Sequence, residues 1–129
     1  DNTADLAALR IGPGVAPRAN IYALRVFGCG GSTGLTAQAI DWATDPNNDD
    51  DLSDRLDVIN MSLGSNYGSA LDVSTIASDN AAAIGVIVVA SAGNAGDTFF
   101  ISGSPGASQR TIAVANSLDG QFISGKVLA

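Results

Sequence analysis

The chain has 129 residues, 46% of them apolar, which suffices for one domain with a hydrophobic core but not for two. Six basic residues against thirteen acidic ones give a net charge of −7, and the scattered basic residues form no nucleic-acid-binding stripe. No apolar run approaches the roughly 20 residues that cross a bilayer. We therefore expect neither a nucleic-acid partner nor a membrane partner.

Four apolar runs predict β-strands, at residues 21–27, 58–63, 86–90 and 111–116. The runs are nearly continuous rather than alternating, which is typical of parallel strands covered on both faces. Apolar residues at helical spacing predict helices at 36–43 and 70–83, with Gly85 placed to end the second. This order predicts an α/β fold in which helices flank a parallel β-sheet through right-handed βαβ units.

In such sheets, ligands bind beyond the carboxyl ends of the strands. Three of these ends are small-residue segments that contain glycine, at residues 28–32, 62–65 and 91–94. Exposed backbone at one edge of the sheet predicts a binding cleft. The alternative for each single segment is that its glycine only allows the chain to turn. Asn94 would hold a neutral amide at the tip of the third segment, and an ordinary turn asparagine is the alternative.

The loop before the first helix also matches G-x-G-x-x-x-G at Gly28, Gly30 and Gly34, a loose form of the dinucleotide fingerprint. The next strand ends in Ser-Leu-Gly, without an acid to hold a ribose, and no P-loop motif is present. A nucleotide-binding domain is therefore a rival that calorimetry would reveal. We expect Cys29 to be a buried or half-buried small residue, because the chain has no histidine to activate its thiol.

Seven of the thirteen acidic residues lie between residues 41 and 57. Oxygen-bearing side chains alternate there as in the first half of an EF-hand loop, although aspartate replaces glycine at the sixth position and leucine replaces glutamate at the twelfth. A solvated acidic loop is the alternative to a structural Ca²⁺ site. The ligands we predict are Asp45, Asn47, Asp49, Asp51, Ser53 and Asp54.

Four motifs give the chain a resemblance to the subtilisin-like serine proteases, or subtilases. They are GVAPRANIYALRV (14–26), DVINMSLGS (57–65), GVIVVASAGNAGD (85–97) and GSPGASQRTIAVANS (103–117). The resemblance covers nearly all of residues 14–117 and is greatest to large secreted subtilases with an inserted protease-associated domain. It implies a partial three-layer α/β/α sandwich, with residues 1–129 as the central part of a peptidase domain. Residues 118–129 would begin the inserted domain or a connecting strand.

The resemblance implies a role for each strand end. Asn94 matches the asparagine of the oxyanion hole, whose amide donates to the negative oxygen formed when serine attacks a peptide carbonyl. The substrate-binding residues it implies are Gly30, Gly31 and Ser32, pairing with the substrate backbone, and Ser62, Leu63, Gly64, Ser91, Ala92, Gly93 and Gly103, forming the walls and base of the S1 pocket.

The chain departs from the family at its catalytic motifs. G-T-S, H-G-T-H and D-[ST]-G, which carry the serine, histidine and aspartate of the triad, do not occur. We therefore expect an extracellular serine endopeptidase as the intact parent, and no turnover from these residues alone. A non-catalytic Ca²⁺-binding or peptide-binding module on the same fold is the alternative.

The helices that carry the family's histidine and serine cover one face of the sheet. Without them, we expect an exposed apolar patch drawn from Ile21, Leu24, Val58, Ile59, Val86 and Val88. Such patches associate, so the sequence predicts a homo-oligomer for the chain by itself.

Overall fold

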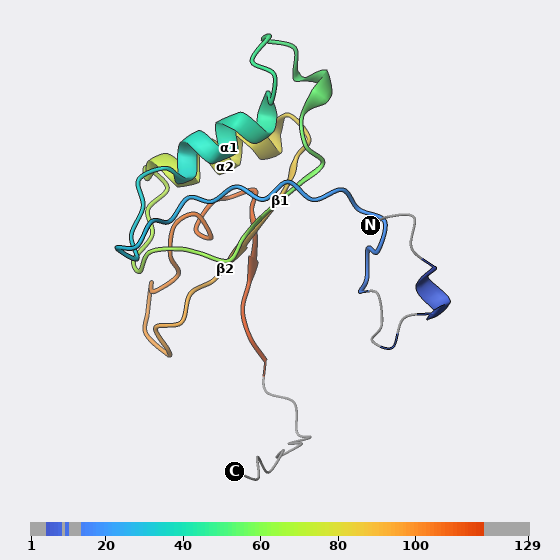
Figure 1. Ribbon diagram of the computed structural model, residues 1–129. Helices are drawn as coiled ribbons and strands as arrows, with labels where there is room; N and C mark the ends of the chain where they lie inside the picture. The colour runs from blue at the N-terminus through green and yellow to red at the C-terminus, as the bar shows by residue number, and fades with distance from the viewer. Residues whose placement is uncertain (1–4, 9, 11–13, 118–129) are drawn as a thin grey trace.

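The computed structural model describes residues 5–8, 10 and 14–117 (Figure 1). In chain order its elements are η1 (Leu6–Ala8), α1 (Thr36–Thr44), η2 (Leu52–Asp54), β1 (Val58–Met61), α2 (Val73–Ala83), β2 (Ile87–Ser91) and β3 (Ile112–Val114). The strands form one parallel sheet in the order β1-β2-β3, which confirms the predicted α/β class. Among the described residues, no helix is long and apolar enough to cross a membrane.

Both helices pack on the same face of the sheet, so the described residues form two layers, and α1 and α2 lie side by side (Figure 1). The strands alternate accordingly: Val88 and Ala90 of β2 are each only 1% exposed beneath the helices. Burial of such side chains stabilises the fold by about 25 cal/mol for each Å² of apolar surface removed from water. The core cluster consists of Ile40, Met61, Ala77, Ala81, Val86, Val88 and Ala90.

The opposite face of the sheet is apolar and exposed. Val58 and Ile87 are register partners on this face and are 52% and 53% exposed, and Ile112 and Val114 of β3 are similarly open. The expected patch is thus only partly right. Val86 and Val88 are wrong, because they point to the helices and are 3% and 1% exposed. Ile59 is wrong as well, because it is the register partner of Val88 and packs against the same core.

The expected strand at 21–27 is also wrong, since this segment has no strand pairing among the described residues. It nevertheless lies beside β1, because Tyr22, Leu24 and Val26 line a small cavity of about 140 Å³ together with Val58 and its neighbours. Tyr22 also contacts Trp42 of α1, with ring centroids 6.0 Å apart. Ile21 is 88% exposed, so little burial supports an extended ladder here.

Helix α2 has well-formed signals at both ends. Asp72 is its N-cap residue: its carboxylate accepts hydrogen bonds from the backbone N–H and the hydroxyl of Ser74, at 2.9 and 2.6 Å. At the other end, Gly85 has φ +98°, and its N–H donates to Ala82 while that of Val86 donates to Ala81. This is a Schellman motif, and it confirms that Gly85 ends the helix.

The segment that leads into β3 is fastened to α2 by Asp79. Its carboxylate accepts hydrogen bonds from the hydroxyl of Ser108, at 2.7 Å, and from the backbone N–H of Arg110, at 3.0 Å. The Ser108 hydrogen bond is the main cause that holds the pKa of Asp79 below its ordinary value, against an opposing effect of desolvation. The position of β3 therefore depends on a charged side chain of the helix layer.

The loop after β1 packs against the turn at residues 102–106 with backbone in contact with backbone. Ser65 N–H donates to the Ser104 carbonyl at 3.0 Å, and Gly68 N–H donates to that of Ser102 at 2.8 Å. A Cβ atom added to Gly103 would overlap the carbonyl oxygen of Ser65. This close approach accounts for a glycine at position 103.

We expect Gly103→Ala to lower the free energy of unfolding of the intact protein by about 1–3 kcal/mol or more, because the added methyl group can be accommodated only by moving backbone. Denaturant unfolding measures this change. Gly28→Ala is the matched control, since no atom lies within 4 Å of the place its new methyl group would occupy and its φ is not positive. Equal free energies of unfolding for the two variants would contradict the packing described here.

Candidate active site

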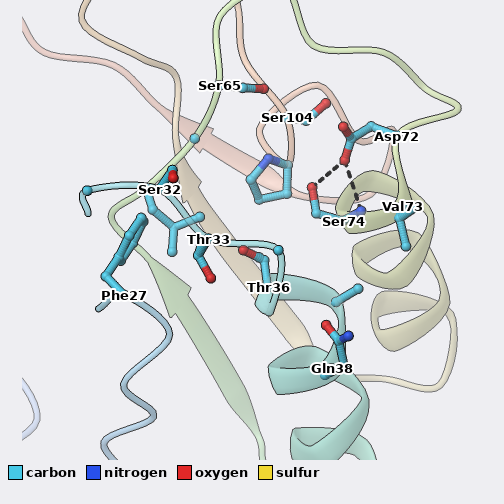
Figure 2. A pocket seen from close by; sticks show the side chains of 16 residues that line it. Phe27, Ser32, Thr33, Thr36, Gln38, Ser65, Asp72, Val73, Ser74 and Ser104 are labelled. Atoms are coloured by element: carbon cyan, nitrogen blue, oxygen red, sulfur yellow. Dashed lines mark hydrogen bonds between the residues drawn. The ribbon is translucent and has the colours of Figure 1, made fainter. Parts of the chain in front are cut away.

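The segment just beyond the carboxyl end of β1 borders a cavity of about 510 Å³ (Figure 2). It lies between the loop before α1, the end of β1, the start of α2 and the turn at Ser104 and Pro105. Four of the predicted substrate-binding residues line it: Gly31, Ser32, Leu63 and Gly64. The two loops predicted from the sequence to flank a bound peptide therefore face one cavity.

A hydrogen bond joins the ends of β1 and β2. The Ser91 hydroxyl donates to the Leu63 carbonyl at 3.0 Å, and the N–H of Ala92 donates to the Val114 carbonyl of β3 at 2.9 Å. The segments 62–64 and 91–93, predicted as opposite walls of one pocket, are thus held next to each other. Gly103 lies behind them, buried against the loop of Ser65 and adjacent to the cavity-lining Ser104.

Asn94 lies three residues beyond the end of β2 and is exposed. Gly93, just before it, has φ +108°, a left-handed conformation in which a residue with a side chain would be strained. No hydrogen bond to the Asn94 amide is recorded among residues 14–117. The amide is therefore free to donate to a ligand, which is the property an oxyanion donor requires.

The loop at residues 28–32 presents unpaired backbone. Its base is closed by Thr33, whose hydroxyl donates to the Val26 carbonyl at 2.6 Å and accepts from Leu35 N–H at 3.0 Å. Within the described chain, the main-chain groups of Gly30, Gly31 and Ser32 have no recorded hydrogen-bond partner. Such an edge can pair with an extended peptide as an added strand.

Sequence reasoning missed the far wall of the cavity. Asp72, Val73 and Ser74 line it from the start of α2, while Thr36 and Gln38 line it from α1 (Figure 2). The expected helix at 70–83 begins instead at Val73. An aspartate directly before an apolar helical run is a recognisable N-cap signal, so the helix start could have been placed, but not the cavity beside it.

In the acidic loop, the carboxylate and amide side chains accept hydrogen bonds from backbone N–H groups of the same loop. Asp45 accepts hydrogen bonds from the N–H groups of Asp49 and Asp50 at 3.2 and 3.0 Å, and Asp51 accepts from Ser53 at 3.0 Å. Asn47 and Asp49 likewise accept from backbone N–H groups two residues ahead.

Within the described ranges, no three Asp, Glu, His or Cys side chains are arranged to hold a metal ion. The predicted ligands Asp45, Asn47, Asp49, Asp51, Ser53 and Asp54 all lie in this loop or in η2. Their oxygens have the right chemistry for Ca²⁺, but in this arrangement several of them bind backbone N–H groups instead. A Ca²⁺ site here stays a prediction.

Cys29 is exposed, so the expected buried or half-buried position is wrong. It lies between two glycines in the loop before α1, where its side chain is open to solvent.

Comparison with known proteins places these features in a family. The sequence profile of the Subtilase family matches residues 2–124. Subtilisin DY of Bacillus licheniformis is 40% identical over 116 residues, which are 88% of this chain and 36% of the relative. Subtilisin E of Bacillus subtilis (strain 168) is 39% identical over 105 residues, 78% of this chain and 25% of the relative.

The Minor extracellular protease Vpr of Bacillus subtilis (strain 168) is 39% identical over 101 residues, 78% of this chain and 12% of the relative. The chain thus spans about a third or less of the length of each of these three relatives. Because the profile covers almost the whole sequence, the chain belongs to the subtilase family of serine peptidases.

Proposed function

We propose that the intact protein is a serine endopeptidase, and that these residues supply its peptide-binding cleft and its oxyanion-hole donor. The observation that carries the proposal is the meeting of the glycine-bearing ends of β1 and β2 with the glycine-rich loop at residues 28–32. Gly31 and Leu63 line one cavity there, the Ser91 hydroxyl is bonded to Leu63, and Asn94 is exposed just beyond. Membership of a serine peptidase family supports the proposal that peptide hydrolysis takes place at this edge.

In the proposed mechanism, an extended substrate pairs with the backbone of Gly30, Gly31 and Ser32 and lies against the walls at 62–64 and 91–93. A serine outside the described residues attacks the peptide carbonyl. The Asn94 amide then donates a hydrogen bond to the oxygen as it becomes negative. A neutral donor fixed at a strand end stabilises charge that exists only in the transition state, without having to reorganise.

The 129-residue chain has no histidine, and therefore no general base of the kind that activates a serine in the Ser-His-Asp triad. The second candidate is a peptide-binding module that keeps the cleft without the chemistry, because the cavity and the open backbone at residues 30–32 could hold a peptide in either case. The two differ in the sequence of the parent reading frame, where H-G-T-H and G-T-S motifs would decide for the enzyme. Similarity to a relative named as an extracellular protease supports an extracellular location for the parent.

We expect Asn94→Ala in the parent protein to lower kcat strongly and leave KM nearly unchanged, because the amide acts in the transition state. In a subtilisin, removal of one such donor costs about 100- to 1000-fold in kcat, and we expect the same range here. Steady-state hydrolysis of a peptide substrate measures both constants.

Asn80→Ala, an exposed asparagine on α2, is the control and should leave both constants unchanged. A large rise in KM with unchanged kcat for Asn94→Ala would show that this amide only positions substrate.

The acidic loop is proposed as a structural Ca²⁺ site because seven aspartates between residues 41 and 57 repel one another, and a counter-ion would relieve that repulsion. We expect the melting temperature of the parent protein to rise with millimolar Ca²⁺ and to fall with chelator. Asp45→Asn and Asp49→Asn together should abolish the difference, whereas Asp97→Asn should preserve it. Superimposable melting curves of the unaltered protein in Ca²⁺ and in chelator would contradict the proposal.

The exposed sheet face supports self-association of the 129-residue chain when it is expressed alone. Val58, Ile87, Ile112 and Val114 present apolar surface on neighbouring strands, each more than half exposed. Light scattering at micromolar concentration should give a mass above that of the monomer, and Ile87→Lys should reduce it. A stable monomer of the unaltered chain would count against this proposal.

A further inference from the structure

The cavity at the strand ends contains one charged side chain, that of Asp72. The other residues that line it are glycines, apolar residues, serines, threonines and a glutamine. Figure 2 shows the Asp72 carboxylate beside Ser74, on the side of the cavity where Ser65 and Ser104 also lie. The formal charge that a ligand meets in this cavity is therefore negative.

One oxygen of this carboxylate is open to a ligand. Oδ1 accepts both hydrogen bonds from Ser74, from its N–H and from its hydroxyl. No partner for Oδ2 is recorded within residues 14–117, and Asp72 is partly exposed. Capping the helix therefore uses Oδ1 of the Asp72 carboxylate and leaves Oδ2 able to pair with a cation.

The cavity is also placed and sized for a substrate side chain. Its lining includes Gly31 and Ser32, whose backbone is unpaired, and Leu63 and Gly64 opposite them. Its volume of about 510 Å³ falls within the about 300–1,000 Å³ of typical small-ligand pockets. A peptide lying between the two loops would direct alternate side chains toward one side of its strand.

We propose that Asp72 is a specificity-determining residue that makes this cavity prefer a lysine or arginine side chain of the substrate. This inference rests on the proposed function, because it assumes that an extended peptide occupies the cleft. The ammonium or guanidinium group would pair with Asp72 Oδ2 through a charge-assisted hydrogen bond.

The alternative is that Asp72 only caps α2. Asp72→Asn separates the two roles, since asparagine caps helices about as well as aspartate but carries no charge. Asp41→Asn is the matched control: it removes the same charge from an exposed position on α1 that does not line the cavity. Gln38→Glu is the converse variant, because it adds a carboxylate to the lining.

The experiment uses the parent protein and quenched fluorescent peptides in which lysine, or its uncharged analogue norleucine, occupies each of the positions flanking the cleaved bond in turn. At one position we expect lysine to exceed norleucine by about tenfold in kcat/KM, the size of one charge-assisted hydrogen bond. Asp72→Asn should abolish this ratio, Asp41→Asn should keep it, and Gln38→Glu should increase it. The ratio should also fall as salt is raised, through screening.

The inference is overturned if no position favours lysine, or if Asp72→Asn keeps the preference with its melting temperature unchanged. If no peptide is cleaved at all, the proposed function fails instead. Fluorescence anisotropy of the same labelled peptides then tests the cavity alone. Tighter binding of one lysine peptide that is lost in Asp72→Asn would support the assignment, and equal affinities would overturn it.

Discussion

The in-register parallel pairing of β1 with β2 is the constraint on which the rest of the structure depends. Val58 is opposite Ile87 and Met61 is opposite Ala90, so both strands reach their carboxyl ends at the same edge. The hydrogen bond from the Ser91 hydroxyl to the Leu63 carbonyl fixes the two chains just beyond that pairing. A slip of one residue would turn every side chain to the other face and separate the two walls of the cleft.

The small residues of the cleft follow from how closely the backbones approach. The turn at 102–106 is bonded to the loop at 65–69, and Gly103 and Gly68 are in positions where a Cβ atom would overlap neighbouring atoms. The Ser104 hydroxyl adds to this contact, because it accepts hydrogen bonds from the Ser69 N–H and from the hydroxyl of the buried Thr75 of α2. The wall of the cleft formed by these two segments is thus held by backbone contacts and buried hydroxyls.

The sequence predicted best what local interactions decide. The helix at 36–43 was predicted to within one residue, because apolar spacing and length specify it, and the end of α2 follows from Gly85 in a left-handed turn. The apolar run at 21–27 predicts a strand just as the runs at 58–63 and 86–90 do. A strand also needs a hydrogen-bonded partner, and this segment lies beside β1 without pairing with it. Continuous apolar runs also could not show that Val88 faces the helices and Ile87 faces outward.

The site was predictable only in part, because its local segments can be recognised in the sequence but the packing that brings them together cannot. The glycine-containing segments can be recognised one by one, and the parallel-sheet rule places those after β1 and β2 at one edge. The opposite wall comes from the start of α2, with Asp72, and from α1, with Gln38. Neither residue belongs to a sequence motif that predicts a cavity. Their position depends on how α1 and α2 pack together on the sheet, which no local pattern specifies.

The most direct test of the oxyanion assignment is a crystal structure of the parent protein with a peptide aldehyde or boronate bound covalently as a tetrahedral adduct. The account predicts that the peptide lies between residues 30–32 and 62–64, with the Asn94 side-chain nitrogen within about 3 Å of the tetrahedral oxygen. An adduct whose oxygen is bound by other groups, with the Asn94 amide turned away from the cleft, would contradict it.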